Sequence, residues 1–248
     1  MRYLILTDIH GNWEALSAIL NHIRRKRYDR VLFLGDAVGY GASPNQVLDW
    51  LRSLSPPAIT IRGNHDRVAA GLDDGLYFNR HALRAAHWTA EHLDDRNHRY
   101  LRDLPEGPRM VDEVVGICHG SPVDEDEYIF SGHEARPAFD VLSTPVIFFG
   151  HTHVASLFAL REDGSMEVRL LVGDNQVIDL EDGVKYLVNP GSVGQPRDRN
   201  YRAAYCLFDT KSRRIHHYRV SYPVERARRR IVRAGLPTVL GDRLLHGV

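Results

Sequence analysis

The amino-acid sequence predicts an α/β fold whose second half is rich in β-structure. From residue 1 to about residue 150, short apolar segments alternate with helical segments, which is typical of parallel strands joined by helices. After Gly150 the helical segments stop and several strand-like segments follow one another. Because no internal repeat, low-complexity tract or flexible linker interrupts this order, we expect residues 1–248 to form one layered domain.

The first half begins with a strand and an amphipathic helix. The strand is Tyr3 to Thr7, and the helix from about Asn12 to Lys26 carries one apolar stripe, formed by Trp13, Leu16, Ile19, Leu20 and Ile23. Further strands are expected at Val31 to Leu34, Ala58 to Ile61, Val114 to Cys118 and Pro145 to Phe149, and further helices at Pro44 to Leu54 and about His133 to Leu142. Each of these strands ends in a short polar turn.

The second half continues as strands and closes with helices. The expected strands are Leu157 to Leu160, Glu167 to Leu171, Gln176 to Ile178, Lys185 to Val188, Ala203 to Phe208 and Ile215 to Val220. Helical pieces near Val224 to Ala234 and Val239 to Leu245 form a helical C-terminal tail at about residues 223–248.

Residues 72–104 do not fit the alternation of strands and helices. They form a helical stretch with no strand partner, so we expect a small helical cap inserted between the third and fourth strands. Inserted segments of this length are often functional, which favours a lid over a site. A helix that only packs, or that contacts another subunit of a homo-oligomer, is the alternative.

Composition excludes several classes of partner. Lys+Arg and Asp+Glu both number 32, so no net positive charge holds the protein on nucleic acid or on an anionic membrane. The longest apolar runs, such as Val146 to Phe149, are far shorter than the roughly 20 residues of a membrane span. The arginine-rich stretch from Arg226 to Arg233 is therefore interpreted as a solvated helix face. We expect neither a membrane nor a nucleic acid partner.

The chain is expected to be cytoplasmic. Asp8 comes too early for residues 1–8 to contain the apolar part of a secretion signal. Cys118 and Cys206 are then expected to be reduced thiols. Cys118 is interpreted as a small buried side chain rather than a ligand, because alternation along a strand turns it away from its neighbour His119.

Polar side chains follow five of the predicted strands. Two Asp, one Asn and five His occur in these turns, at Asp8, His10, Asp36, Asn64, His65, His119, His151 and His153. Because binding residues gather where parallel strands end, we expect them to meet at one edge of a sheet. Oxygen and imidazole ligands suit Mn, Fe or Zn. Eight candidates exceed the six ligands of one octahedral ion, which favours two ions that share a bridging carboxylate.

The order of these motifs resembles that of the calcineurin-like metallophosphoesterase family. Asp8-Ile9-His10, Gly35-Asp36, Gly63-Asn64-His65-Asp66, His119-Gly120 and Gly150-His151-Thr152-His153 match its D-x-H, G-D, G-N-H-D/E, H-G and G-H-x-H motifs in chain order. The resemblance covers about residues 1–220. It implies a four-layer α-β-β-α sandwich with a binuclear metal centre.

The same resemblance implies roles for the motif residues. Asp8, His10 and His153 would hold one ion, Asn64, His119 and His151 would hold the other, and Asp36 would bridge them. The expected cofactors are two divalent metal ions, with Mn²⁺ the first choice and Fe, Zn, Ni and Mg the alternatives. His65 would stay off the metal ions.

The chemistry of such a centre suits a phosphoester substrate. Two divalent cations, two carboxylates and a bridging hydroxide leave a local charge of about +1, which attracts a phosphoryl group. Metal binding lowers the pKa of water to about 7, so hydroxide is available to attack phosphorus. We expect His65 to donate a proton or hydrogen bond to the leaving oxygen and Asp66 to orient His65. A purely structural hydrogen bond is the alternative role for His65.

Further residues are candidates for substrate contact. Asn189-Pro190-Gly191-Ser192 is first of all a turn, but related bacterial proteins carry this segment near the active site. Ser192 and Arg197 are therefore candidate contacts, and Tyr40 and Asn45, downstream of Asp36, have the same standing. Arg62 is a further candidate, because the G-D-x-x-D-R-G arginine of some family members is missing here.

That missing arginine favours one substrate class. Gly35 to Gly41 reads G-D-A-V-G-Y-G, which favours small bacterial phosphodiesterase-like members acting on phosphodiesters or nucleotides. A phosphomonoesterase acting on a small metabolite is the alternative enzyme, since Arg62, Arg197 or a cap arginine could replace the missing one. A non-catalytic scaffold that binds other proteins is the alternative from another class.

Overall fold

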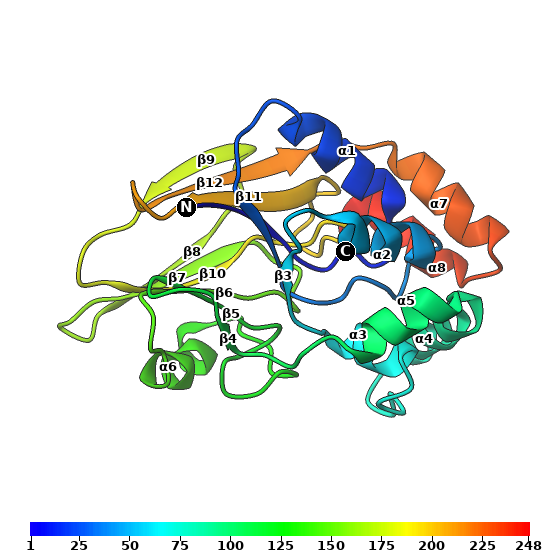
Figure 1. The fold of residues 1–248 in the computed structure, drawn as a ribbon, viewed down its shortest axis with the longest axis horizontal. Helices are drawn as coiled ribbons and strands as arrows, with labels where there is room; N and C mark the ends of the chain where they lie inside the picture. The colour runs from blue at the N-terminus through cyan, green and yellow to red at the C-terminus, as the bar shows by residue number, and fades with distance from the viewer.

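Two six-stranded β-sheets packed face to face, with helices on their outer sides, form the architecture in the computed structural model, which describes residues 1–248 (Figure 1). The predicted four-layer α-β-β-α arrangement is therefore confirmed. The first sheet has the order β3-β2-β1-β11-β12-β9 and the second the order β4-β5-β6-β10-β7-β8.

Each sheet combines a parallel part with an antiparallel part. In the first sheet, β1 (Arg2–Leu6), β2 (Arg30–Phe33) and β3 (Ile59–Thr60) are parallel, and β11 (Ala203–Asp209), β12 (Arg214–Val220) and β9 (Asn175–Asp179) continue antiparallel. In the second sheet, β5 (Val115–Ile117), β6 (Val146–Phe148) and β10 (Lys185–Asn189) are parallel, flanked by β4 (Arg109–Met110), β7 (Ser156–Leu160) and β8 (Met166–Leu170). The two-residue strand β4 was not predicted, because two residues are too few to carry a periodic pattern.

Alternation along β1 divides the core into two layers. Tyr3 and Ile5 point between the sheets, where they pack with residues of the second sheet such as Val146 and Phe148. Leu4 and Leu6 point outward and pack under the helices. One five-residue strand is thereby fixed on both of its faces, which also fixes the position of Asp8 just beyond its end.

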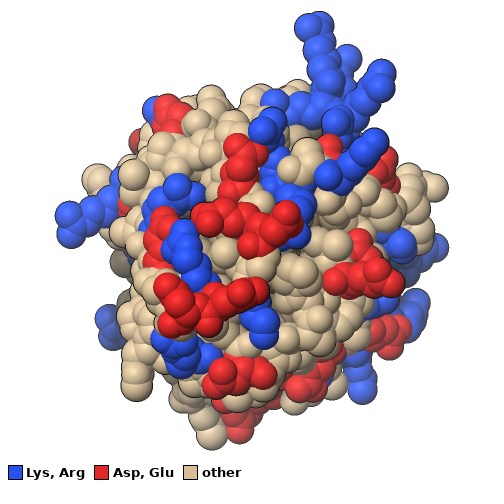
Figure 2. All heavy atoms as spheres, turned by 90° about the vertical axis from the view of Figure 1, so that its left-hand side faces the viewer, with Lys and Arg blue, Asp and Glu red and all other residues tan.

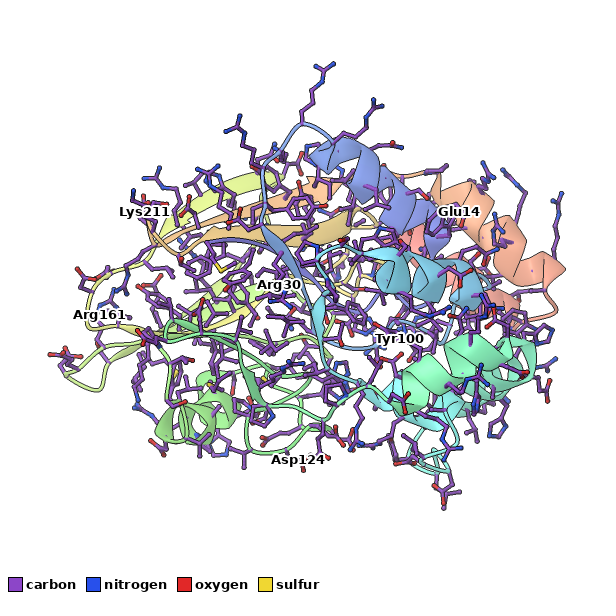
Figure 3. All side chains as sticks on the ribbon, in the orientation of Figure 1. Glu14, Arg30, Tyr100, Asp124, Arg161 and Lys211 are labelled. Atoms are coloured by element: carbon purple, nitrogen blue, oxygen red, sulfur yellow. The ribbon has the colours of Figure 1, made fainter.

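Helices cover the outer faces of both sheets (Figure 1). Helices α1 (Trp13–Ile23), α2 (Pro44–Ser53), α7 (Val224–Arg233) and α8 (Thr238–His246) contribute to the core outside the first sheet, and α6 (Gly132–Asp140) packs outside the second. Asn12 caps α1 by accepting a hydrogen bond from Ala15 N (3.1 Å). Arg230 of α7 donates to Glu14 of α1 (2.9 Å; Glu14 is labelled in Figure 3), which attaches the C-terminal helices to the first one.

The segment around residues 64–104 is a group of three helices beside α2 (Figure 1). Helices α4 (Arg80–His92) and α5 (Asp95–Arg102) occupy the stretch expected to be helical. The turn predicted at Gly63 to Asp66 is in fact the start of a helix, α3 (Asn64–Ala69). The helix begins here because the carboxylate of Asp66 accepts a hydrogen bond from Gly63 N (3.2 Å) and caps the first turn.

The surface carries charges of both signs, and both cysteines lie in the interior. Acidic and basic side chains are interspersed over most of the face shown in Figure 2, and basic side chains gather at its upper right. None of the helices is both long enough and apolar enough to cross a membrane. Cys118 and Cys206 are buried and unpaired, and Cys118 packs in the core beneath α6.

Candidate metal centre

Polar turns from both sheets converge on one buried cluster. Asp8 follows β1, Asp36 follows β2 and Asn64 follows β3 in the first sheet, whereas His119 follows β5 and His151 follows β6 in the second. The expectation that these turns share one edge of a single sheet is therefore wrong. The strand ends of two facing sheets meet instead, so the cluster lies between the sheets and its residues are buried.

The cluster contains two overlapping groups of ligand atoms. Asp8, His10, Asp36 and His153 form the first group, and Asp36, His119 and His151 form the second. Within each group the ligand atoms lie within 4.8 Å of one another, and every residue is buried. Asp36 Oδ2 lies 3.5 Å from both His10 Nε2 and His119 Nε2, so this one carboxylate belongs to both groups. The arrangement is able to bind a pair of divalent metal ions.

Asn64 stands beside the second group. Its Oδ1 lies 3.4 Å from His119 Nε2, and it lines the cavity above the cluster. As the first residue of α3 it is placed by the helix cap described above.

Backbone carbonyl groups fix which ring nitrogen of each histidine faces the cluster. A carbonyl oxygen only accepts, so Nδ1 of His10, His119 and His153 donates to Val38 (2.9 Å), Leu34 (2.8 Å) and Gln195 (2.6 Å), respectively. His151 is reversed, because its Nε2 donates to the carbonyl of Asp126 (3.1 Å). Three histidines thus direct Nε2 toward the cluster, and His151 directs Nδ1 toward it. Histidine ligands of metal ions are typically oriented in this way, by a hydrogen bond from the ring nitrogen that does not bind the metal.

Buried atoms without hydrogen-bond partners make the cluster suitable for a cation. Asp8 Oδ1 and Asp36 Oδ2 are buried without any hydrogen-bond partner. Nε2 of His10 lies 3.0 Å from Nε2 of His153, although both rings use Nδ1–H for a backbone carbonyl. Two facing lone pairs and two bare carboxylate oxygens are costly when buried, unless a positive ion lies among them. The residues therefore fit divalent metal ions with nitrogen and oxygen ligands.

The proton affinities of these groups lead to the same conclusion. Burial lowers the pKa of His10 and His153 well below the ordinary histidine value and lowers that of His151 to about 3, so all three are neutral. Burial also acts to lower the pKa of His119, but attraction to Asp36 and Asp8 outweighs it and raises this pKa to about 10. Neutral imidazole is the form that binds a metal ion, and His10, His151 and His153 are already in that form. The raised pKa of His119 indicates that Asp36 and Asp8 favour a positive charge at this place.

Strained backbone is concentrated at the cluster. Eight non-glycine residues have a positive φ, and six of them are cluster residues or their neighbour, namely Asp8, His10, Asp36, Tyr40, His151 and His153. Left-handed backbone is unfavourable for residues with a Cβ atom, and such strain persists mainly where function requires it. The fold therefore keeps the ligand side chains directed at the cluster at the cost of an unfavourable local backbone conformation.

Two glycines provide the space that these side chains occupy. A Cβ atom on Gly63 would overlap the carboxylate of Asp36, and one on Gly39, where φ is 87°, would overlap the ring of His65. Both positions therefore need glycine for reasons that lie at the site rather than in the turn itself.

His65 lies beside the cluster and faces a cavity. Its ring is packed between Tyr40 and Phe78, each with its centroid 4.4 Å away, and Nδ1 has no hydrogen-bond partner. Asp66 does not contact it, contrary to the expectation that this carboxylate orients His65. The carboxylate of Asp66 instead accepts from Val38 N and Gly63 N, both at 3.2 Å, because its side chain turns back to cap α3.

The cavity above the cluster has a volume of about 430 Å³. Of the five predicted substrate contacts, Tyr40 and Arg197 line it. Ser192 is buried behind the cluster, where its Oγ donates to the carbonyl of Asp8 (2.8 Å). Its position makes it a support for the Asp8 turn.

Arg62 and Asn45 lie away from this cavity. Arg62 forms ion pairs with Glu106 and Glu125, both at 2.7 Å. Asn45 joins α2 to the other helices, donating to the carbonyl of His92 (2.8 Å) and accepting from Asp94 N (3.0 Å). Neither side chain is free to bind a substrate in the cavity.

Several lining residues were not predicted from the sequence, and three of them bear on the site. Phe78 packs on His65, Tyr128 stacks on His151 with ring centroids 3.9 Å apart, and Arg243 reaches the cavity from α8. No local signal marked Arg243, because the packing of α8 alone brings it to the site.

Comparisons with known proteins agree with this geometry. A family model described as calcineurin-like phosphoesterase matches residues 1–155. An uncharacterised protein of Methanocaldococcus jannaschii is 36% identical over 248 residues, which is 98% of this chain and 97% of that protein. The crystal structure of a metallophosphoesterase from Sphaerobacter thermophilus is 36% identical, with a TM-score of 0.86 over 100% of both chains. A symmetrical bis(5'-nucleosyl)-tetraphosphatase of Psychromonas ingrahamii is 30% identical over 81 residues, 32% of this chain and 29% of that enzyme.

Proposed function

The chain belongs to the calcineurin-like phosphoesterase family, and we propose that it is a binuclear metal-dependent phosphoesterase that hydrolyses a phosphodiester or nucleotide-type phosphoester. The observation that carries the proposal is the pair of overlapping ligand groups that share Asp36. A shared carboxylate is the usual way to hold two cations close enough to act on one phosphoryl group.

Seven residues are assigned to the two ions. Asp8, His10 and His153 hold the first ion, Asn64, His119 and His151 hold the second, and Asp36 contacts both. When bound, the ions polarise the phosphoryl group and lower the pKa of a water molecule. Mn²⁺ is proposed as the metal, because a mixed set of carboxylate, amide and imidazole ligands without thiolate suits it.

His65 is proposed to assist the leaving group. Its ring lines the cavity, with Nδ1 buried against Gly39 and Nε2 without a hydrogen-bond partner within the protein. Tyr40 and Phe78 hold the ring from two sides, so its direction does not depend on Asp66. A ring held in this way can donate a hydrogen bond to the oxygen that leaves phosphorus.

The proposed substrate class rests on two observations. The turn after β2 lacks the arginine of the G-D-x-x-D-R-G motif, which favours diesters over simple monoesters. The tetraphosphatase that matches 81 residues acts, by its name, on a dinucleoside substrate, which supports a nucleotide-type phosphoester.

Turnover of two chromogenic substrates tests the proposal. With added Mn²⁺, the protein is expected to hydrolyse bis-p-nitrophenyl phosphate faster than p-nitrophenyl phosphate. Elemental analysis should find about two metal ions per chain, and Asp36→Asn should lose both, because Asp36 contacts both groups.

The outcomes separate the alternatives. A faster reaction with p-nitrophenyl phosphate would indicate a phosphomonoesterase. Activity on neither substrate, with both metal ions bound, would indicate a non-catalytic protein-binding scaffold. An Asp36→Asn protein with full metal content would contradict the shared carboxylate.

A further inference from the structure

The cavity above the metal centre holds two arginines that the chemistry described so far does not use. Arg197 follows the turn after β10, and Arg243 lies on α8. Both line the same cavity as Asn64, His65 and His151. Any substrate placed at the metal centre therefore also meets these two guanidinium groups.

Arg197 is held by neutral partners. Its Nη2 donates to Tyr40 Oη (3.1 Å) and its Nε donates to Gln195 Oε1 (3.3 Å). No Asp or Glu side chain forms an ion pair with it, unlike the nearby Arg219, which pairs with Asp198. Its position is fixed while its charge is left uncompensated.

Arg243 also lacks an Asp or Glu partner. Its Nε donates to an oxygen of Val248 (2.7 Å), the last residue of the sequence, and no Asp or Glu side chain lies within ion-pair distance. Other arginines of the C-terminal helices do have such partners, for example Arg228 with Asp242 (2.7 Å). Burial and the neighbouring Arg197 both lower the pKa of Arg243, so two like charges are held together in a half-buried cavity. Two guanidinium groups at one cavity wall attract an anion to the space beside them.

Tyr40 separates this pair from the metal ligands. The rings of His10 and His65 pack against the Tyr40 ring, with centroids 4.7 and 4.4 Å away, whereas Arg197 bonds to the phenol oxygen at the tip of that ring. The arginines and the ligand atoms are therefore neighbouring positions rather than one position. A group of two phosphates joined by one oxygen can reach both.

We propose that Arg197 and Arg243 form a second anion subsite, and that the substrate is a nucleotide with a phosphate linked to the one under attack. The proposal rests on the proposed function for the position of the attacked phosphate. Planar guanidinium groups bind phosphate through paired N–H donors, which suits this role. Tyr77, exposed at the cavity wall, offers a flat ring on which a nucleobase can stack.

Calorimetric titration of metal-free protein with inorganic pyrophosphate tests the subsite independently of catalysis. We expect Arg243→Gln and Arg197→Gln each to weaken binding about 10-fold or more, which is the loss expected for one charge-assisted hydrogen-bonding group. Arg233→Gln is the matched control, because Arg233 is an exposed arginine of α7 outside the cavity, and its affinity should equal that of the unsubstituted protein. Equal affinities in all four proteins would overturn the proposal.

Inhibition of the Mn²⁺-dependent hydrolysis of bis-p-nitrophenyl phosphate provides the second test, at fixed free Mn²⁺. Pyrophosphate should inhibit the unsubstituted protein more strongly than inorganic phosphate, and Arg243→Gln should remove that preference while Arg233→Gln retains it. If Arg243→Gln weakens both inhibitors equally, the arginines bind the attacked phosphate itself and the second subsite is wrong. Absence of hydrolysis, together with arginine-dependent pyrophosphate binding, would overturn the proposed function and leave the subsite in place.

Discussion

At the scale of single residues, the site depends on side chains that are held away from their local preferences. His10 and His153 have positive φ angles, and their Nε2 atoms face each other at 3.0 Å. Local backbone energy alone would select other conformations, at a cost of about 1 to 3 kcal/mol for each such residue. The surrounding core outweighs that cost, which is why these residues are positioned before any ligand arrives.

His65→Ala is expected to separate catalysis from metal binding. The ring packs against Tyr40, Phe78 and the ring of His10 but contributes no atom to either metal group, so metal content should stay the same. The rate should fall on the order of 10²-fold, the typical effect of losing a group that donates to the leaving oxygen. Elemental analysis and steady-state kinetics on bis-p-nitrophenyl phosphate measure the two quantities; unchanged turnover would remove His65 from the mechanism.

His217 is expected to make the fold sensitive to acid. It is fully buried, its Nε2 donates to the carbonyl of Pro190 (3.1 Å), and burial lowers its pKa from 6.5 to about 3. Below about pH 6.5, His217 binds a proton in the unfolded chain but not in the folded chain. The stability associated with His217 is therefore fully present above that pH and falls as the pH drops toward 3. Between pH 7.5 and pH 5 this residue should cost about 2 kcal/mol.

Urea unfolding of metal-free protein at these two pH values tests this assignment. His217→Gln keeps an N–H donor for Pro190 but does not titrate, so its loss of stability should be smaller by about 2 kcal/mol. His133→Gln, an exposed substitution on α6, is the control and should behave like the unsubstituted protein. An equal loss in all three would exclude His217 as the acid-sensitive group.

Sequence analysis correctly identified the site residues that belong to short local motifs. Asp8, His10, Asp36, His119, His151 and His153 each follow a strand, and the structure brings them together. Arg62 and Asn45 were placed at the cavity wrongly, because nothing local shows that Glu125 and His92 lie nearer to them. Arg243 was missed for the corresponding reason, since only the packing of α8 brings it to the cavity.

At the scale of elements, helix α3 connects the metal centre to the loops around it. It begins with Asn64 and His65, and one turn later Arg67 reaches out to Glu125, Asp126 (2.6 Å) and the hydroxyl of Tyr77 (2.9 Å). The carbonyl of Asp126 in turn holds His151. One arginine therefore ties together α3, the loop before α4 and the loop after β5.

Arg67→Met is expected to loosen this connection. Removal of one partner from a largely buried ion pair costs about 3 kcal/mol, which should lower Tm by roughly 10 °C in a chain of this size. Thermal unfolding measures this effect. Mn²⁺ affinity should also fall, by roughly 10-fold or more, because the support of His151 is weakened.

A surface ion pair provides the control for this substitution. Arg161 pairs with Glu181 (3.0 Å) at the opposite end of the molecule from α4 and α5, as Figure 3 shows. Arg161→Met should leave Tm nearly unchanged, because exposed pairs contribute little. A Tm for Arg67→Met that matches the Arg161→Met value would contradict the structural role of Arg67.

Most elements followed from periodicity, and the exceptions are elements that depend on distant parts of the chain. Strands such as β1 and helices such as α1 have apolar patterns with periods of 2 and 3.6, so they were predicted to within a few residues. Helix α3 was taken for a turn because its cap depends on the direction of the Asp66 side chain. Local pattern alone placed the motifs on one sheet, since periodicity does not reveal which strands pair.

At the scale of the whole molecule, the metal centre joins the two sheets. Asp8 and Asp36 extend from the first sheet, and His119, His151 and His153 extend from the second. Between them lie buried carboxylate oxygens without partners, which weaken the contact between the sheets at this point. A cation bound there compensates the carboxylates and links both layers, so binding should stabilise the entire fold.

Mn²⁺ is therefore expected to raise Tm, and a chelator should reverse the increase. An ion present at about 100 times its dissociation constant stabilises the folded state by about 2.7 kcal/mol, which corresponds to roughly 5 to 10 °C for a chain of this size. Asp36→Asn should abolish the increase, because it removes the carboxylate common to both groups, whereas His133→Gln on the surface should retain it. Thermal unfolding with and without Mn²⁺ measures the difference. An equal increase in Asp36→Asn would place the stabilising ion elsewhere, and the two sheets would then be held together by their apolar core alone.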